Sequence, residues 1–324
     1  MADAPALLPA PAPESQALAV AIAQAEKYFQ AAQAENTRRA YNSDWRHFNE
    51  WCNKAGQGSL PAAPETVVLY LSTLAETAKV STLTRRISAI SQAHQAAGFA
   101  SPTEHLAVRK VMAGIRRQKG TAQTGKRPVL TEDLRAMVGT LSEKRMLDVR
   151  DRALLLVGFA GAFRRSELVN LDVEDLLFGR GGLVVTIRRS KTDQEGQGRR
   201  VGIPYGSTPA TCPVRALQAW LEILGSDEGP VFRGINRHGQ IAGKRLTAQT
   251  VALVVKRIAA AAGLASGELA GHSLRAGLAT AAAMAGVSER AIMAQTGHRS
   301  VATLRRYIRE GSLFLENAAA KVGL

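Results

Sequence analysis

The chain has 324 residues, of which 46% are hydrophobic, and its 42 Lys and Arg against 27 Asp and Glu give a formal net charge of +15. This composition supports two folded domains and excludes a chain that is disordered throughout. The charge favours a polyanionic partner, and nucleic acid is preferred to a membrane surface because the sequence has no long apolar span and no basic amphipathic helix. Two cysteines are too few for a disulfide framework, which fits a reducing, cytoplasmic setting.

The N-terminal part of the chain is predicted to be helical. Residues 1–16 are rich in Ala and Pro, carry no positive charge of the kind that begins a secretory signal, and are expected to form a disordered leader. Residues 17–118 show helical spacing and are expected to form one all-helical domain. Its second helix starts at Thr37 and places apolar side chains on one face and arginines on the others. Later helices are expected over residues 65–76, 82–97 and 105–117.

A change in composition separates this region from a second domain. Residues 119–128 have almost no apolar side chains and are predicted to be a basic linker, so the second domain covers residues 129–324. Helices are expected there over 131–141 and 148–160 and again from about residue 213, and antiparallel strands over 183–189 and 200–204. The fold is therefore expected to be mainly α, with an all-helical N-terminal domain and a mostly helical second domain that contains a small antiparallel β-sheet.

Several short segments of the second domain carry residues that are suited to chemistry. Arg164 and Glu167 lie three positions apart on one helix face, and so do His272 and Arg275. Lys191 lies in the predicted turn between the two strands. Each segment also has an ordinary explanation: a surface ion pair, a chance His-x-x-Arg pair or a solvated lysine. None of them is specific when taken alone.

The last such segment contains His298 and, nine residues later, Tyr307. On one continuous helix this offset is about two and a half turns, which would put the two side chains on opposite sides. Gly297 can end one helix and Ser300 can cap the next, so His298 is expected in the connection and Tyr307 on the short helix after it. Without a partner in the other segments, Tyr307 would be interpreted as an ordinary half-buried aromatic residue.

Taken together, the segments match in order the signature of one enzyme family, namely Arg164, Lys191, His272, Arg275, His298 and Tyr307. The chain thereby resembles the tyrosine recombinase, or phage integrase, family, with a Cre-like layout of helical domain, basic linker and C-terminal tyrosine. One departure is Ala276, at a position where many members carry a second histidine. His298 is the commoner family residue at a position where Cre has tryptophan, so the chain is not expected among the closest relatives of Cre.

The resemblance implies a site-specific DNA recombinase that cuts and rejoins strands through a 3′-phosphotyrosine at Tyr307. Breaking a phosphodiester without a metal requires a nucleophile, a proton donor for the leaving oxygen and cations around the phosphate. Arg164, Arg275 and His298 are then expected to bind the phosphate oxygens.

The remaining roles also follow from the resemblance. Lys191 is expected to protonate the leaving 5′ oxygen, and His272 to help accept the tyrosine proton. Glu167 is expected to orient Arg164 or His272. No metal and no other cofactor is expected.

The implied partner is double-stranded DNA with an inverted-repeat site, bound by a homotetramer in the bacterial cytoplasm or nucleoid. The family leaves room for an accessory directionality protein, and no membrane partner is expected. Apolar residues of 311–324 are expected to dock into a neighbouring subunit as an exchange tail. In the first domain, DNA contacts, mostly to phosphates, are expected from Arg38, Arg39, Arg85 and Arg86.

Three alternative functions stay open. A metal-dependent nuclease needs converging carboxylates, but Asp172, Glu174 and Asp175 follow a helix end and are interpreted as a solvated turn. A DNA-binding regulator that does not cut is disfavoured because every catalytic position is filled. A type IB topoisomerase shares the same set of residues, and only the apolar tail argues against it.

Overall fold

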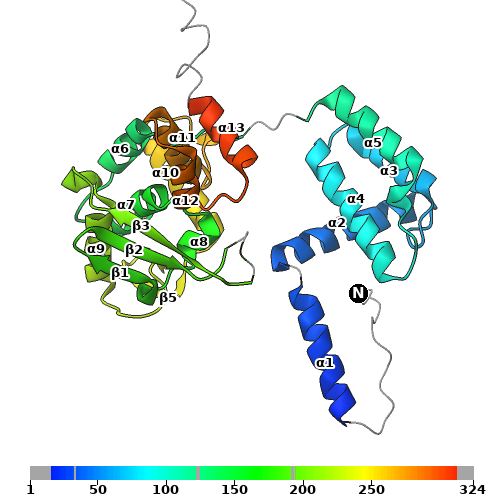
Figure 1. The fold of residues 1–324 in the computed structure, drawn as a ribbon, viewed down its shortest axis with the longest axis horizontal. Helices are drawn as coiled ribbons and strands as arrows, with labels where there is room; N and C mark the ends of the chain where they lie inside the picture. The colour runs from blue at the N-terminus through cyan, green and yellow to red at the C-terminus, as the bar shows by residue number, and fades with distance from the viewer. Residues whose placement is uncertain (1–15, 33, 122–124, 191–192, 194, 312–324) are drawn as a thin grey trace, which may run out of the picture. The chain divides into compact units, whose positions relative to one another are not determined.

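The structure is a computed structural model that describes residues 16–32, 34–121, 125–190, 193 and 195–311. The chain divides into two compact units, Met1–Thr124 and Gly125–Leu324 (Figure 1). The predicted leader up to residue 15 and the predicted tail from residue 312 lie outside the described residues. Among the described helices, none is both long enough and apolar enough to cross a bilayer.

The first unit is helical, as its apolar spacing predicts. Its helices are α1 (Gln16–Ala31), α2 (Glu35–Lys54), α3 (Pro64–Ala75), α4 (Val80–Ala96) and α5 (Leu106–Lys119), with a short 3-10 turn, η1 (Pro102–Glu104), before the last. The four helices from α2 onward share one core, in which Phe48, Tyr70, Leu83 and Ile90 are fully buried. Burial of these large side chains is the main favourable contribution to folding of this unit.

The second unit is built around α7 (Met146–Ala160), which is buried on nearly every side. Its residues from 148 to 159, except residue 152, are all buried, as expected for a helix at the centre of a domain. The helices around it are α6 (Thr131–Gly139), α8 (Arg165–Val169), α9 (Pro213–Leu224), α10 (Ala248–Ala261), α11 (Ser273–Met284), α12 (Glu289–Thr296) and α13 (Val301–Gly311). Short 3-10 turns η2 (Val173–Asp175), η3 (Pro209–Thr211) and η4 (Ser266–Glu268) connect them. Because α7 packs against α6, α9 and α11, it fixes where the chain leaves its C-terminal end.

A small antiparallel sheet lies beside these helices, with the strand order β1 (Leu176–Gly179), β2 (Gly182–Ile187) and β3 (Arg199–Pro204). The inward side chains of β2 and β3 share one face of the sheet, where Leu183 pairs with Ile203 and Ile187 with Arg199. The two strands predicted from the sequence are present, although β2 ends two residues earlier than predicted. Three further strands were not predicted: β1, and the separate pair β4 (Arg233–Ile235) and β5 (Ile241–Arg245).

The last three helices, α11 to α13, lie together at one side of the second unit (Figure 1). Gly297 ends α12 in the left-handed conformation, with φ of 67°, and the Ser300 hydroxyl accepts a hydrogen bond from the Thr303 amide near the start of α13. The break expected from the sequence is therefore confirmed. It places His298 in a tight connection and Tyr307 on α13.

Helix α11 packs closely against the segment before α6. A Cβ atom on Gly277 would lie 1.9 Å from the carbonyl oxygen of Val129, whose amide donates to Ser273 of the same helix. Gly277→Ala should therefore lower the free energy of unfolding of the second unit by about 1–3 kcal/mol, through overpacking against backbone. Urea unfolding of the full chain measures this.

The matched control is Gly139→Ala at the end of α6, where an added Cβ meets no atom within 4 Å. It should leave the unfolding midpoint unchanged or raise it slightly, because alanine is the better helix former. Equal effects of the two substitutions would contradict the packing argument.

Candidate active site

The turn after α7 carries the first arginine of the site. Ala162, fully buried, has a φ of 49°, a left-handed conformation that is uncommon for a residue with a Cβ. Arg164 follows two residues later and immediately precedes α8. The Glu167 carboxylate accepts two hydrogen bonds from Arg164, 2.9 Å from its amide and 2.5 Å from Nη1 of its side chain. Glu167 is itself buried, so it holds the Arg164 guanidinium in one orientation.

Arg275, in the first turn of α11, is 1% exposed. Its Nη1 donates to the carbonyl oxygens of Ala162, at 2.8 Å, and of Thr296. Its Nη2 is buried and has no hydrogen-bond partner among the described residues. The pKa of Arg275 is lowered to about 10. The main cause is burial, and the second is the like charge of Arg164. The group remains a cation at neutral pH, and its Nη2 is a donor that an anion can satisfy.

Tyr307 lies beside the residue that precedes α11. Its Oη is 2.8 Å from Nε2 of His272, and its ring centroid is 5.7 Å from that of His298. Tyr307 is half-buried, whereas His272 is exposed. An imidazole nitrogen at this distance from a phenol can accept its proton.

His298 lies in the connection between α12 and α13. Its Nδ1 is 2.8 Å from the hydroxyl oxygen of Thr296. The pKa of His298 is lowered to about 4, mainly by burial and next by the positive charges of Arg275 and Arg164. The imidazole is therefore neutral at neutral pH.

A third arginine, Arg199, adjoins this cluster and was not singled out in the sequence. Its Nη1 donates to the carbonyl oxygen of Gln295 at 3.1 Å, and its Nη2 lies 3.5 Å from the Glu167 carboxylate. Burial lowers the pKa of Arg199. The guanidinium also lies directly behind Gly297, because a Cβ at that position would come within 2.9 Å of its Nε. The signal in the sequence was strand alternation, which puts Arg199 on the same face as Val201 and Ile203.

The structure thus brings together six of the seven side chains that the sequence predicts for catalysis. They are Arg164, Glu167, His272, Arg275, His298 and Tyr307. The seventh, Lys191, lies outside the described residues. Their roles in a reaction stay predictions.

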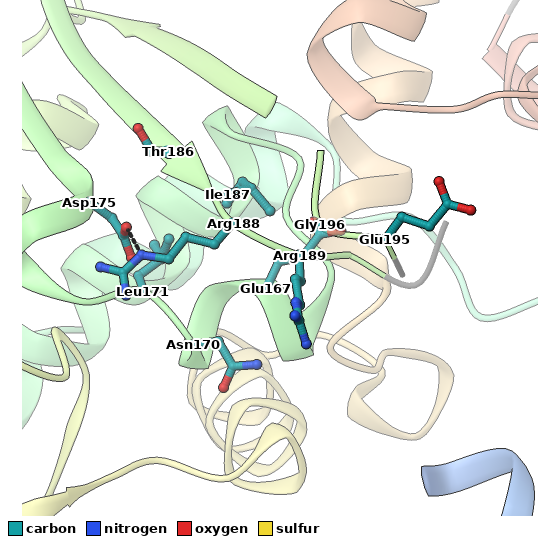
Figure 2. A pocket seen from close by; sticks show the side chains of 10 residues that line it. All are labelled: Glu167, Asn170, Leu171, Asp175, Thr186, Ile187, Arg188, Arg189, Glu195 and Gly196. Atoms are coloured by element: carbon teal, nitrogen blue, oxygen red, sulfur yellow. Dashed lines mark hydrogen bonds and ion pairs between the residues drawn. The ribbon is translucent and has the colours of Figure 1, made fainter. Parts of the chain in front are cut away.

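Two cavities flank the cluster. The larger, of about 430 Å³, lies between α8 and the end of β2, and Figure 2 shows the Arg188–Asp175 ion pair at one end of it. Its lining includes three carboxylates, those of Glu167, Asp175 and Glu195, and two arginines, Arg188 and Arg189. The smaller, of about 220 Å³, is lined by Arg199, His298 and Arg299 among others. The smaller cavity thus contains Arg199 and His298 of the cluster, and the larger contains Glu167.

The acidic residues after α8 are not the solvated turn that the sequence suggested. Asp175 is 6% exposed and lies 2.7 Å from Nε of Arg188, while Asp172 accepts from Arg245 at 3.0 Å. Glu174 alone is exposed, and it accepts from the Gly229 amide. The sequence interpretation was wrong because it could not show that arginines from β5 and the end of β2 converge on these carboxylates. In the part of the chain that the structure describes, no group of three or more His, Cys, Asp or Glu side chains is placed to hold a metal ion.

The four arginines predicted to contact DNA differ in exposure. Arg38 and Arg39 are exposed on α2, and Arg39 pairs with Glu35. Arg85 is half exposed and donates twice to the buried Asp44, at 2.6 and 3.0 Å.

Arg86 instead points inward. Its side chain is 14% exposed and donates a hydrogen bond to the hydroxyl of Tyr70. Burial raises the pKa of Tyr70 to about 12. Arg86 therefore helps to hold α4 against α3, and of the four arginines it offers least of its surface to a ligand.

Comparison with known proteins shows which family the chain is similar to. A family model described as the phage integrase family matches residues 128–312, and one described as the phage integrase N-terminal SAM-like domain matches residues 18–98. An integrase/recombinase XerD homolog of Selenomonas ruminantium is 43% identical over 298 residues, which cover 91% of this chain and 87% of that protein. The Cre recombinase of Escherichia phage P1 is 27% identical over 300 residues, which cover 86% and 85% of the two chains.

Solved structures show the same fold. A lambda integrase dimer bound to a core site aligns with a TM-score of 0.59 at 16% identity, covering 89% of this chain and 93% of that one. A lambda integrase tetramer bound to a Holliday junction aligns with a TM-score of 0.60 at 15% identity, covering 91% and 78%. The matched catalytic family model spans more than half of the chain, and the XerD homolog is similar over nearly all of it. The chain therefore belongs to the phage integrase family of tyrosine recombinases.

Proposed function

We propose that this recombinase cleaves and rejoins DNA at specific sites through a covalent 3′-phosphotyrosine at Tyr307, without a metal or another cofactor. The observation that carries the proposal is the 2.8 Å contact between the Tyr307 hydroxyl and Nε2 of His272, close to the buried guanidinium of Arg275. This contact supports the proposal because a tyrosine nucleophile needs a proton acceptor and an anion-binding group beside it.

The first step joins the enzyme to the DNA. Tyr307 Oη attacks the phosphorus atom, and its proton passes to Nε2 of His272. The bond from phosphorus to the 5′ oxygen breaks, and that oxygen takes a proton from Lys191, a role that rests on the family resemblance alone. The phosphodiester is replaced by a phosphotyrosine of similar energy, so a 5′ hydroxyl can reverse the step and rejoin a strand.

The arginines bind the phosphate as its charge grows in the transition state. Arg275 has Nη2 available, and Arg164 presents a guanidinium whose position is fixed by Glu167. In a buried site such fixed donors stabilise developing charge more strongly than water does, because they need no reorganisation. His298 adds a further hydrogen bond to a non-bridging oxygen.

The proposed substrate is double-stranded DNA with an inverted-repeat site, bound by four copies of the chain in the bacterial cytoplasm or nucleoid. The net charge of +15 supports a DNA partner, and a lambda integrase tetramer on a Holliday junction shares the fold. The relatives matched over most of the chain are recombinases, which favours this function over a topoisomerase. Assembly through residues 311–324 and any accessory directionality protein stay predictions from the family resemblance.

Salt dependence tests the proposed DNA contacts. The logarithm of the binding constant should fall linearly with the logarithm of salt concentration, with a slope of about −0.9 for each phosphate neutralised. Arg38→Ala should make the slope shallower by about one unit, because it removes one cation from the exposed face of α2. Fluorescence anisotropy with a labelled duplex measures both slopes. A flat salt response of the wild type would contradict phosphate binding by the basic surface.

The substitution Tyr307→Phe tests the nucleophile. It removes only the hydroxyl, so DNA binding should persist while the covalent adduct is lost, because water lacks the fixed position of the tyrosine. The assay uses a suicide substrate nicked near the cleavage point, denaturing gels that detect protein on labelled DNA, and EDTA in the buffer.

The matched control is Tyr205→Phe, an exposed tyrosine of the same unit whose ring contacts Arg215. It should form adduct at the wild-type level. Adduct from Tyr307→Phe at that level would overturn the assignment, and loss of all activity in EDTA would indicate metal-dependent chemistry instead.

A further inference from the structure

Thr296, the last residue of α12, contacts two of the side chains assigned to the phosphate. It is fully buried, and its hydroxyl oxygen lies 2.8 Å from Nδ1 of His298. Its carbonyl oxygen accepts a hydrogen bond from Nη1 of Arg275. One residue therefore holds a histidine through its side chain and an arginine through its backbone.

The Thr296 hydroxyl has two neighbours but only one proton. The second neighbour is the carbonyl oxygen of Ile292, one helical turn earlier, at 2.7 Å. In the structure the hydroxyl donates to this carbonyl, so it accepts from Nδ1 of His298, and a neutral ring then has no proton on Nε2. If the hydroxyl instead turns to donate to Nδ1, it gives up its hydrogen bond to Ile292, and the neutral ring carries its proton on Nε2. The direction of this hydroxyl therefore selects the tautomer of His298.

The tautomer of His298 decides whether its Nε2 can donate a hydrogen bond to a phosphate oxygen. Around its ring lie the guanidinium groups of Arg275 from α11, Arg164 from the turn before α8 and Arg199 from β3, together with His272 and the Tyr307 phenol. These cations oppose a positive charge on the ring and, together with burial, lower its pKa to about 4. A neutral imidazole can donate to a phosphate oxygen from Nε2 only while Nδ1 accepts.

We propose that Thr296 is a positioning residue whose hydroxyl donates to Nδ1 of His298 in the DNA complex and so keeps the proton on Nε2, facing a non-bridging phosphate oxygen. The inference rests on the function proposed above. A buried hydroxyl that served only to satisfy the Ile292 carbonyl would contribute to stability, but its loss would have the same effect whether or not His298 is present.

The experiment is a double-mutant cycle on the rate of adduct formation with the nicked suicide substrate. Thr296→Val keeps the shape of the side chain and the carbonyl that holds Arg275, and it removes only the hydroxyl; Thr296→Ser keeps the hydroxyl. Loss of a partner that orients a reacting group costs on the order of tenfold or more, so Thr296→Val should be slower by about this factor and Thr296→Ser should stay within about threefold of wild type. In a His298→Ala background, Thr296→Val should change the rate by less than about twofold, because no imidazole is left to orient.

A matched control is Thr280→Val on α11, a buried threonine whose hydroxyl has no hydrogen-bond partner among the described residues. It should leave the rate unchanged and should show that removing a buried hydroxyl does not by itself slow the reaction. An equal loss from Thr296→Val with and without His298 would overturn the inference.

A second measurement does not depend on cleavage. In ¹⁵N-histidine-labelled Tyr307→Phe protein bound to duplex DNA, the His298 nitrogens should show the proton on Nε2, and adding Thr296→Val should change that signature. A proton on Nδ1 in the complex, or a spectrum that Thr296→Val leaves unchanged, would also overturn the inference. Absence of adduct from the wild-type protein would instead refute the proposed function, while the spectra still test the contact between Thr296 and His298.

Discussion

Three guanidinium groups, those of Arg164, Arg199 and Arg275, are held close together near the buried carboxylate of Glu167. The arrangement is unfavourable in the absence of a ligand, because burial removes water from the cations and they repel one another. The cost is visible in the lowered pKa values of Arg275, about 10, and of His298, about 4. Glu167 offsets part of the repulsion through its contacts with Arg164 and Arg199. What remains is an excess of positive charge that a phosphodiester, with its single negative charge, would relieve.

The rest of the second unit keeps these charges in place. The buried α7 fixes the turn at Ala162, whose carbonyl oxygen binds Arg275, and the end of α12 supplies a second carbonyl to the same guanidinium. Gln295, the neighbour of Thr296, binds the carbonyl oxygens of Ala160 and Gly202, which ties α12 to both α7 and β3. Packing of the helices therefore determines the electrostatics of the site. A rigid frame of this kind lets the donors meet a transition state without reorganising.

The sequence predicted the parts of this architecture that depend on local pattern. Helical spacing located the helices of the first unit to within two residues, and Gly297 and Ser300 predicted the break that separates His298 from Tyr307. The order of the segments along the chain identified the family because such an order arises rarely by chance.

Contacts between distant segments could not be predicted in this way. The strands β4 and β5 are three and five residues long and carry no apolar alternation, so their pattern resembled a loop. Arg199 was not singled out because it precedes the strand predicted over 200–204, although the alternation of β3 turns it inward. Arg86 was expected to contact DNA because of its charge, and the sequence could not show that it donates a hydrogen bond to Tyr70. The contact between the Thr296 hydroxyl and His298 likewise depends on the fold at the end of α12.

The central claim is that Tyr307 becomes bonded to a 3′ phosphate within this cluster of cations. The most direct measurement is mass spectrometry of the trapped adduct after digestion with nuclease and protease, which locates the modified side chain and the polarity of the nucleotide attached to it. The account predicts a nucleotide joined through its 3′ phosphate to Tyr307, and to none of the other four of the five tyrosines in the chain. A nucleotide on any other residue, or one joined through its 5′ phosphate, would contradict it.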